Sequence, residues 1–204
     1  MSSFRSISPS IKGEEWSGEL YFDPDASDKS ENRTGHYITH DSLRTKLKQL
    51  VGGDEKINYV YIYKTPLFKK QLTHAILYHA YVVMETDTHF WSLEKNSKEL
   101  ILQRSETLEH VRDYCQGKKR NLLVSQSEPI LWKYKEKRTS LLQLFGYLWW
   151  KDDLNRAYNW LASNCQKFAT RIFDYFSEPN DTISTAGSLQ RRPFYSCMLM
   201  PFWW

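Results

Sequence analysis

Hydrophobic and polar positions change their period along the chain, and this change predicts where strands and helices lie. Between residues 57 and 104, apolar and β-branched residues form short runs separated by turn residues, which is typical of strands. From about Thr139 onward, apolar residues recur every three or four positions, which is typical of helices. Strands in the middle and helices late predict an α+β fold, an antiparallel β-meander packed against helices.

The same pattern gives approximate bounds for the predicted elements. Strands are expected at 57–63, 79–84, 89–95, 99–104 and 121–126. Helices are expected at 42–51, 105–115, 140–150, 153–162 and 165–176.

Three segments differ in polarity and predict the organisation of the chain. Residues 1–41 are polar and rich in turn residues, so we expect a loosely ordered arm with one short strand near 18–22. Residues 42–178 are expected to form a single α+β domain. Residues 179–204 are a polar loop followed by an apolar, aromatic tail.

Composition narrows the class of protein. A chain of 204 residues with 41% hydrophobic and 15% aromatic residues is long and apolar enough to bury a core. A net charge of +4 is mild and no nucleic-acid-binding motif is present, so no nucleic-acid partner is predicted. The 3 cysteines include no C-x-x-C pair, which argues against disulfides and a structural metal site. We expect a cytoplasmic protein with no cofactor and no metal, because no signal peptide or membrane-spanning stretch is present.

The helix expected at 165–176 begins with a cysteine. Ser163 and Asn164 are both good N-cap residues, so Cys165 falls in the first turn. Unpaired N–H groups and the positive end of the helix dipole stabilise a thiolate there. The same donors suit an oxyanion formed when sulfur attacks a carbonyl, so Asn164 and Gln166 are predicted at a cap and oxyanion site.

The alternative interpretation of Cys165 is structural. Its helix carries an apolar face made by Cys165, Phe168, Ala169, Ile172 and Phe176. The sulfur therefore points toward the body of the protein, where most free cysteines are simply small buried hydrophobic residues.

His79 is the best candidate for a base, because it opens an otherwise apolar strand. A turn centred between Thr86 and Asp87 places Glu94 opposite His79 in the hairpin. Glu94 would then bind one ring nitrogen and leave the other for the thiol. A one-residue slip would move Glu94 to the other face, and an ordinary surface pair is the alternative interpretation.

The predicted register fixes the remaining pairs of the hairpin. They are Met84 with His89, Val82 with Trp91 and Ala80 with Leu93 on one face, and Val83 with Phe90 and Tyr81 with Ser92 on the other. His89 is accordingly expected to face away from His79.

The segment "YNWLASNCQKFATRIFDYF" resembles the Asn-Cys-x-x-Phe segment of circularly permuted papain-like thiol enzymes. Such a motif occurs in the lecithin–retinol acyltransferase family and in the PPPDE family of deubiquitinase- and deSUMOylase-like peptidases, both relatives of the NlpC/P60 group. The resemblance covers about residues 75–176. His79 precedes Cys165, which is the order of the permuted families and the reverse of ordinary papain.

This resemblance implies a fold, a set of site residues and an activity. It implies a permuted papain-like core with Cys165 as nucleophile, His79 as base, and His89, Ser92 or Glu94 as the third polar residue. The implied activity is a thiol hydrolase or acyltransferase that acts on an ester, thioester or amide through an acyl-enzyme intermediate. A PPPDE-like cysteine peptidase or isopeptidase and a non-catalytic binding module on the same fold are the alternatives.

The tail and the basic runs bear on partners. The implied substrate is an acyl-bearing lipid or a peptide. Arg191 and Arg192 followed by aromatic residues suit contact with a membrane surface, and packing of the tail over the domain is the alternative. The runs "GKKRN" and "KYKEKR" are interpreted as solvated surface, and Cys115 as an ordinary cysteine.

Overall fold

The structure, a computed structural model, describes residues 15–29, 35–66, 78–120, 129–159 and 163–176. Its strands are β1 (Glu19–Asp23), β2 (His36–Thr39), β3 (Lys56–Pro66), β4 (Tyr78–Thr86), β5 (Phe90–Lys95), β6 (Leu100–Ser105), β7 (Tyr114–Cys115), β8 (Lys118–Lys119) and β9 (Ile130–Ser140). Its helices are α1 (Leu43–Val51), α2 (Leu108–Arg112), α3 (Leu141–Trp150) and α4 (Cys165–Tyr175).

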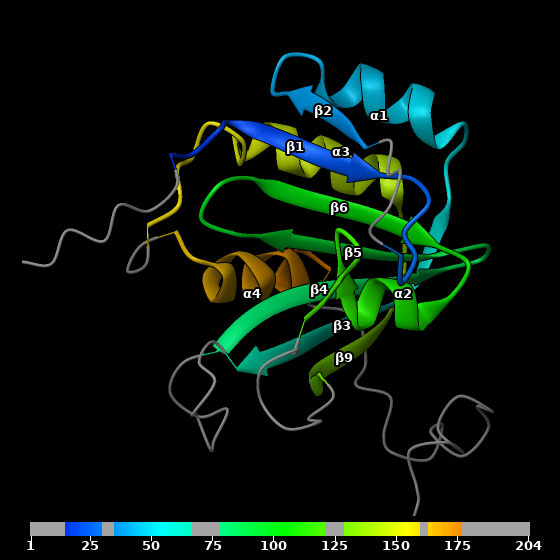
Figure 1. The fold of residues 1–204 in the computed structure, drawn as a ribbon. Coiled ribbons are helices and arrows are strands. Elements are labelled where there is room, and N and C mark those ends of the chain that lie inside the picture. Colours follow the sequence, from blue (N-terminus) through cyan, green and yellow to red (C-terminus); the bar gives the residue numbers. More distant parts are fainter. Residues whose placement is uncertain (1–14, 30–34, 67–77, 121–128, 160–162, 177–204) are drawn as a thin grey trace, which may run out of the picture.

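Seven of the strands form one sheet at the centre of the described part of the chain (Figure 1). The order across the sheet is β2-β1-β6-β5-β4-β3-β9, and β7 and β8 form a separate hairpin. Neighbouring strands are antiparallel except β1 and β6, which run parallel. The predicted α+β class with an antiparallel meander is confirmed.

The sheet is buried on both faces, which explains the continuous apolar run of β4. Val82 and Met84 belong to a core shared with α1, α3 and α4, which includes Phe168. The alternate residues of β4, such as Tyr81, belong to a second cluster with Val111 of α2. Strands covered on both sides lack the apolar–polar alternation of a half-exposed strand.

Two predicted helices are confirmed together with their ends. Leu43, Leu47 and Val51 of α1 are buried at helical spacing, and Gly52 ends that helix at a left-handed φ of 78°. Ser140 and Gln143 form a capping box at the start of α3, which satisfies two backbone groups and fixes where the helix begins.

The segment expected to form a polar arm contributes to the sheet instead. Residues 19–23 and 36–39 form β1 and β2, and Leu20, Phe22 and Ile38 are completely buried. These strands are short and separated by turn residues, so their periodicity is weak in the sequence. The described part of this segment therefore belongs to the domain.

The helix predicted at 153–162 is wrong for its described part. Residues 153–159 form turns and irregular backbone. Asp152, directly after α3, has a left-handed φ of 57°, and buried Asp153 is ion-paired with Arg171. The carbonyl of Leu154 accepts a hydrogen bond from the Trp16 indole at 2.6 Å. These long-range partners hold the backbone in a non-helical path.

Other differences concern the limits of elements. The helix predicted at 105–115 ends at Arg112, and Tyr114–Cys115 form β7. Strand β9 covers "KYKEKR", one of the two runs that were interpreted as solvated surface. The strand expected at 121–126 and the tail at 179–204 lie outside the described residues. No helix in the described ranges is long and apolar enough to cross a membrane.

Candidate active site

Cys165 is the first residue of α4, and its helix is capped as predicted. The side chain of Asn164 accepts a hydrogen bond from the backbone N–H of Lys167 at 2.9 Å. Cys165 is only 3% exposed, because the apolar face of α4 packs against the sheet. The backbone N–H groups of Cys165 and Gln166 lie in the first turn, where no partner within the helix is available.

The sulfur of Cys165 lies against the edge of β4, beyond the last residue of β5. The thiol donates to the carbonyl of Tyr78 at 3.9 Å, and the N–H of Ala80 points at the sulfur. Val82 is the first residue of β4 that pairs with β5, so no strand among the described residues pairs with this edge of β4 before Val82. A side chain from either face of the sheet can therefore reach the sulfur here.

The hairpin register differs from the predicted one by two residues. The structure pairs Val82 with Leu93 and Met84 with Trp91, because the turn is centred between Asp87 and Thr88. A shift of two residues preserves the face of every side chain, whereas a shift of one would have reversed it.

His79 and Glu94 consequently remain on one face, as diagonal rather than directly opposite neighbours. His79 Nε2 lies 2.6 Å from Glu94 Oε2, which is the predicted contact. The His79 ring also stacks on Tyr81, with ring centroids 6.1 Å apart. The imidazole is thus held on one side by a carboxylate and faces the thiol of Cys165 on the other.

These contacts change the acidity of both partners. Burial alone would lower the pKa of His79, but hydrogen bonds and charge interactions with Cys165 and Glu94 raise it from 6.5 to about 9. Burial alone would raise the pKa of Cys165, but the hydrogen bond and charge of His79 lower it below its usual value of 9.0. Both shifts therefore favour transfer of the thiol proton to the imidazole.

Arg120, from the run "GKKRN" that was interpreted as solvated surface, forms an ion pair with Glu94. Its Nη1 donates to Glu94 Oε2 at 2.7 Å, and both side chains are only 4% exposed. Its guanidinium also stacks over Tyr81, 3.9 Å from the ring centroid. Burial alone would raise the pKa of Glu94, but Arg120 and His79 hold it far below its usual range. Glu94 is therefore a carboxylate at neutral pH.

Tyr158 is a further site residue that sequence reasoning missed. Burial, the charge of Cys165 and a hydrogen bond between them raise the pKa of Tyr158 to about 12. Its hydroxyl stays protonated and donates to the sulfur. Local pattern places Tyr158 in a predicted helix, and only its position seven residues before Cys165 in the resembling segment could have drawn attention to it.

The other predicted site residues have different partners. His89 Nδ1 lies 2.9 Å from Glu55 Oε1, on the face of β5 opposite to Glu94. Ser92 is completely buried. The side-chain amide of Gln166 donates to the Tyr78 carbonyl at 3.0 Å, which ties α4 to β4. Of the candidates for the third polar residue, the structure brings only Glu94 to His79.

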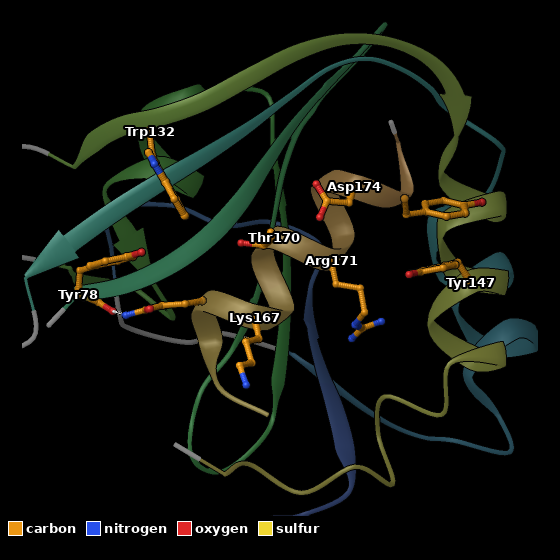
Figure 2. Close-up of a pocket in the computed structure, with 9 residues that line it drawn as sticks. Tyr78, Trp132, Tyr147, Lys167, Thr170, Arg171 and Asp174 are labelled. Carbon is orange, nitrogen blue, oxygen red and sulfur yellow. Dashed lines mark hydrogen bonds between the residues drawn. The ribbon is translucent and has the colours of Figure 1, made fainter. Parts of the chain in front are cut away.

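A surface groove of about 600 Å³ crosses the outer side of α4. Figure 2 shows Tyr78 and Trp132 at one end and Tyr147 at the other, with Arg171 on α4 between them. Gln166, the residue after the nucleophile candidate, also lines the groove. The groove therefore passes close to the start of α4, whereas the side chain of Cys165 belongs to the buried face of that helix.

Comparisons with protein-family profiles, with curated proteins and with solved structures find no match to this chain. In the described part of the chain, no group of three or more His, Cys, Asp and Glu side chains is arranged to hold a metal ion. We therefore infer the chemistry from the geometry around Cys165.

Proposed function

We propose that the protein is a thiol hydrolase or acyltransferase that acts on ester, thioester or amide carbonyls through an acyl-enzyme intermediate. The observation that carries this proposal is the chain of contacts from Cys165 to His79 to Glu94 at the start of α4. A capped helix N-terminus, a thiol of lowered pKa and an oriented imidazole are the parts that nucleophilic thiol catalysis requires.

In the first step, the Cys165 thiolate attacks the carbonyl carbon and a carbon–sulfur bond forms. The carbonyl oxygen becomes an oxyanion, for which the N–H groups of Cys165 and Gln166 and the hydroxyl of Tyr158 are donors. When the carbonyl bond to the leaving group breaks, His79 gives its proton to that group. The acyl group is then a thioester on Cys165.

In the second step, neutral His79 removes a proton from water or from an acceptor alcohol or amine. The oxygen or nitrogen attacks the thioester, and the thiolate leaves. Glu94, held ionised by Arg120, stabilises the imidazolium and fixes the ring orientation throughout. Because the pKa of His79 is about 9, the rate is expected to fall as the pH rises through that value.

The order of the elements supports a circularly permuted papain-like core as part of this proposal. The base candidate opens β4, its carboxylate lies on β5, and the nucleophile candidate opens α4 much later in the chain. This matches the arrangement that the Asn-Cys-x-x-Phe segment implies.

The decisive experiment traps the acyl group. Purified protein is incubated with aryl esters and thioesters, and peptides containing Cys165 are analysed by mass spectrometry for the added acyl mass. Wild type should show the adduct and release the leaving group in a burst. Cys165→Ser should show neither, and His79→Asn should slow both by at least about a hundredfold. His36→Asn, on strand β2, is the matched control and should behave like wild type.

Alkylation supplies a test that needs no substrate. Iodoacetamide at about pH 6 should label Cys165 much faster than Cys115. Equal and slow labelling of both, with no turnover of any ester, thioester or amide, would instead identify a non-catalytic binding module.

A further inference from the structure

We propose that Lys64 and Lys133, together with Trp132, form a subsite that binds an anionic group of the substrate beside the thiol. The inference rests on the proposed function and specifies its substrate class. The substrate would carry a carboxylate or phosphate a few bonds away from the carbonyl that Cys165 attacks.

Two ammonium groups lie close to the ring of Trp132. Lys64 Nζ lies 3.6 Å from the centroid of the Trp132 ring and 4.2 Å from that of Tyr78. Lys133 Nζ lies 4.7 Å from the Trp132 centroid. Trp132 and Tyr78 meet edge to face, with centroids 5.7 Å apart, so the two rings and the two cations form one cluster.

Like charges are held close here without a carboxylate partner. Burial and the charge of Lys133 lower the pKa of Lys64, and no described acidic side chain lies within ion-pair distance of either lysine. Aromatic rings stabilise these cations only partly. An anion bound close to both ammonium groups would offset the repulsion between them.

This surface is continuous with the candidate active site through a single residue. The ring of Tyr78 contacts Lys64, and its carbonyl accepts from the Cys165 thiol and from Gln166. Tyr78 and Trp132 also line one end of the groove, as Figure 2 shows. A ligand with its anionic group on the lysines would therefore extend along Tyr78 toward the sulfur.

The charged residues that line the groove do not offer the same site. The guanidinium of Arg171 is ion-paired with the buried carboxylate of Asp153. Lys167 and Asp174, which also line the groove, carry opposite charges. Neither Lys64 nor Lys133 has an ion-pair partner among the described residues.

The experiment compares thioesters of equal length that differ only in charge. One is neutral, one carries a terminal carboxylate on the acyl side, one a carboxylate on the thiol side, and one a phosphate monoester on the thiol side. For wild type, kcat/KM with at least one anionic thioester should exceed that of the neutral one by about tenfold or more, and added salt should reduce the difference. The preferred anion distinguishes a carboxylate-bearing substrate from a phosphate-bearing one.

The double variant Lys64→Gln with Lys133→Gln should lose this preference, mainly through KM, and keep wild-type turnover of the neutral thioester. Lys118→Gln with Lys119→Gln on β8, which removes the same two charges from exposed positions, should keep it. Equal turnover of all four thioesters by wild type, or an unchanged preference in the double variant, would overturn the subsite and leave the thiol chemistry intact.

A binding measurement without turnover tests the subsite independently of the proposed thiol chemistry. Non-hydrolysable thioethers with the same charged groups are titrated into wild type and the double variant by calorimetry. The subsite predicts binding of an anionic thioether that is about tenfold weaker in the double variant. This result would stand even if no thioester were hydrolysed, and equal binding would refute the subsite.

Discussion

The two described cysteines lie near opposite charges, and this difference separates a candidate nucleophile from an inert thiol. Burial and the negative charge of Glu94 raise the pKa of Cys115 well above its usual value. Cys165 is also buried, but it faces the imidazolium of His79 and the donors at the start of α4. Burial alone therefore does not decide thiol acidity, and the sign of the nearest charge does.

Tyr158→Phe should weaken the thiolate without disturbing the fold. The change removes one hydroxyl that donates to sulfur, and a hydrogen bond to a charged group contributes about 1.5–3 kcal/mol. The pKa of Cys165 should rise, and its rate of alkylation by iodoacetamide at about pH 6 should fall about tenfold. Tyr37→Phe, at an exposed tyrosine of β2, is the matched control and should label like wild type. Identical labelling of the two variants would remove Tyr158 from the site.

Three site residues could be predicted from the sequence and two could not. The difference is how far along the chain the residues lie that indicate each role. Cys165 lies behind a local cap, and His79 opens an apolar strand whose hairpin partner carries Glu94. Each of these signals lies within one element or one hairpin. Arg120 and Tyr158 acquire their roles only through contacts with distant residues, so their sequence neighbourhoods indicated solvated surface and helix.

Helices and strands also differ in whether local sequence or distant contacts determine them. Helices α1 and α3 have caps and buried faces that local sequence determines. Strand β9 was missed because it is an edge strand whose lysines interrupt the apolar pattern, as edge strands commonly require. Residues 153–159 have helical spacing, but the ion pair between Asp153 and Arg171 fixes a different backbone path. Local propensity was overridden where a buried charge needed a distant partner.

The β7–β8 hairpin is expected to stabilise the domain through the residue that follows it. Arg120→Gln would leave the buried Glu94 with one cationic partner instead of two, and breaking a buried ion pair costs about 3–5 kcal/mol. Lys119→Gln removes the same charge from the adjacent exposed position, where substitutions change stability by about 0.5 kcal/mol or less. Urea unfolding measures both.

A milder variant still gives a measurement if Arg120→Gln does not fold. Arg120→Lys keeps the charge but loses the geometry that lets the guanidinium bind Glu94 and stack on Tyr81 together, so its stability should lie between the other two. Equal unfolding free energies for all three variants would show that this hairpin does not support the site.

At the scale of the whole molecule, the candidate site is a set of charges enclosed between two apolar layers. His79, Glu94 and Arg120 extend toward the cluster that contains Tyr81 and α2, while the thiol comes from the helix on the opposite core. The arrangement is possible because β5 ends before the start of β4 is covered. Assembly of the site therefore depends on both layers being folded, and stability and site chemistry share the same ionisable groups.

Glu94 should therefore make the stability of the molecule dependent on acid. Its pKa is far below 4.5 in the folded protein, so its contribution is complete above pH 4.5 and is lost as the pH falls toward the folded value. Glu94→Gln leaves Arg120 buried and unpaired, which should cost about 3–5 kcal/mol near neutral pH. The difference in unfolding free energy between wild type and this variant should be constant between pH 4.5 and 6.5 and narrow below pH 4.5. It should narrow again as the pH rises from 6.5 toward about 9, because Glu94 also stabilises the protonated form of His79. Glu109→Gln, on the exposed side of α2, should show no such difference at any pH, and a Glu94→Gln difference that stayed flat in acid would mean that the carboxylate is not held ionised by Arg120 and His79.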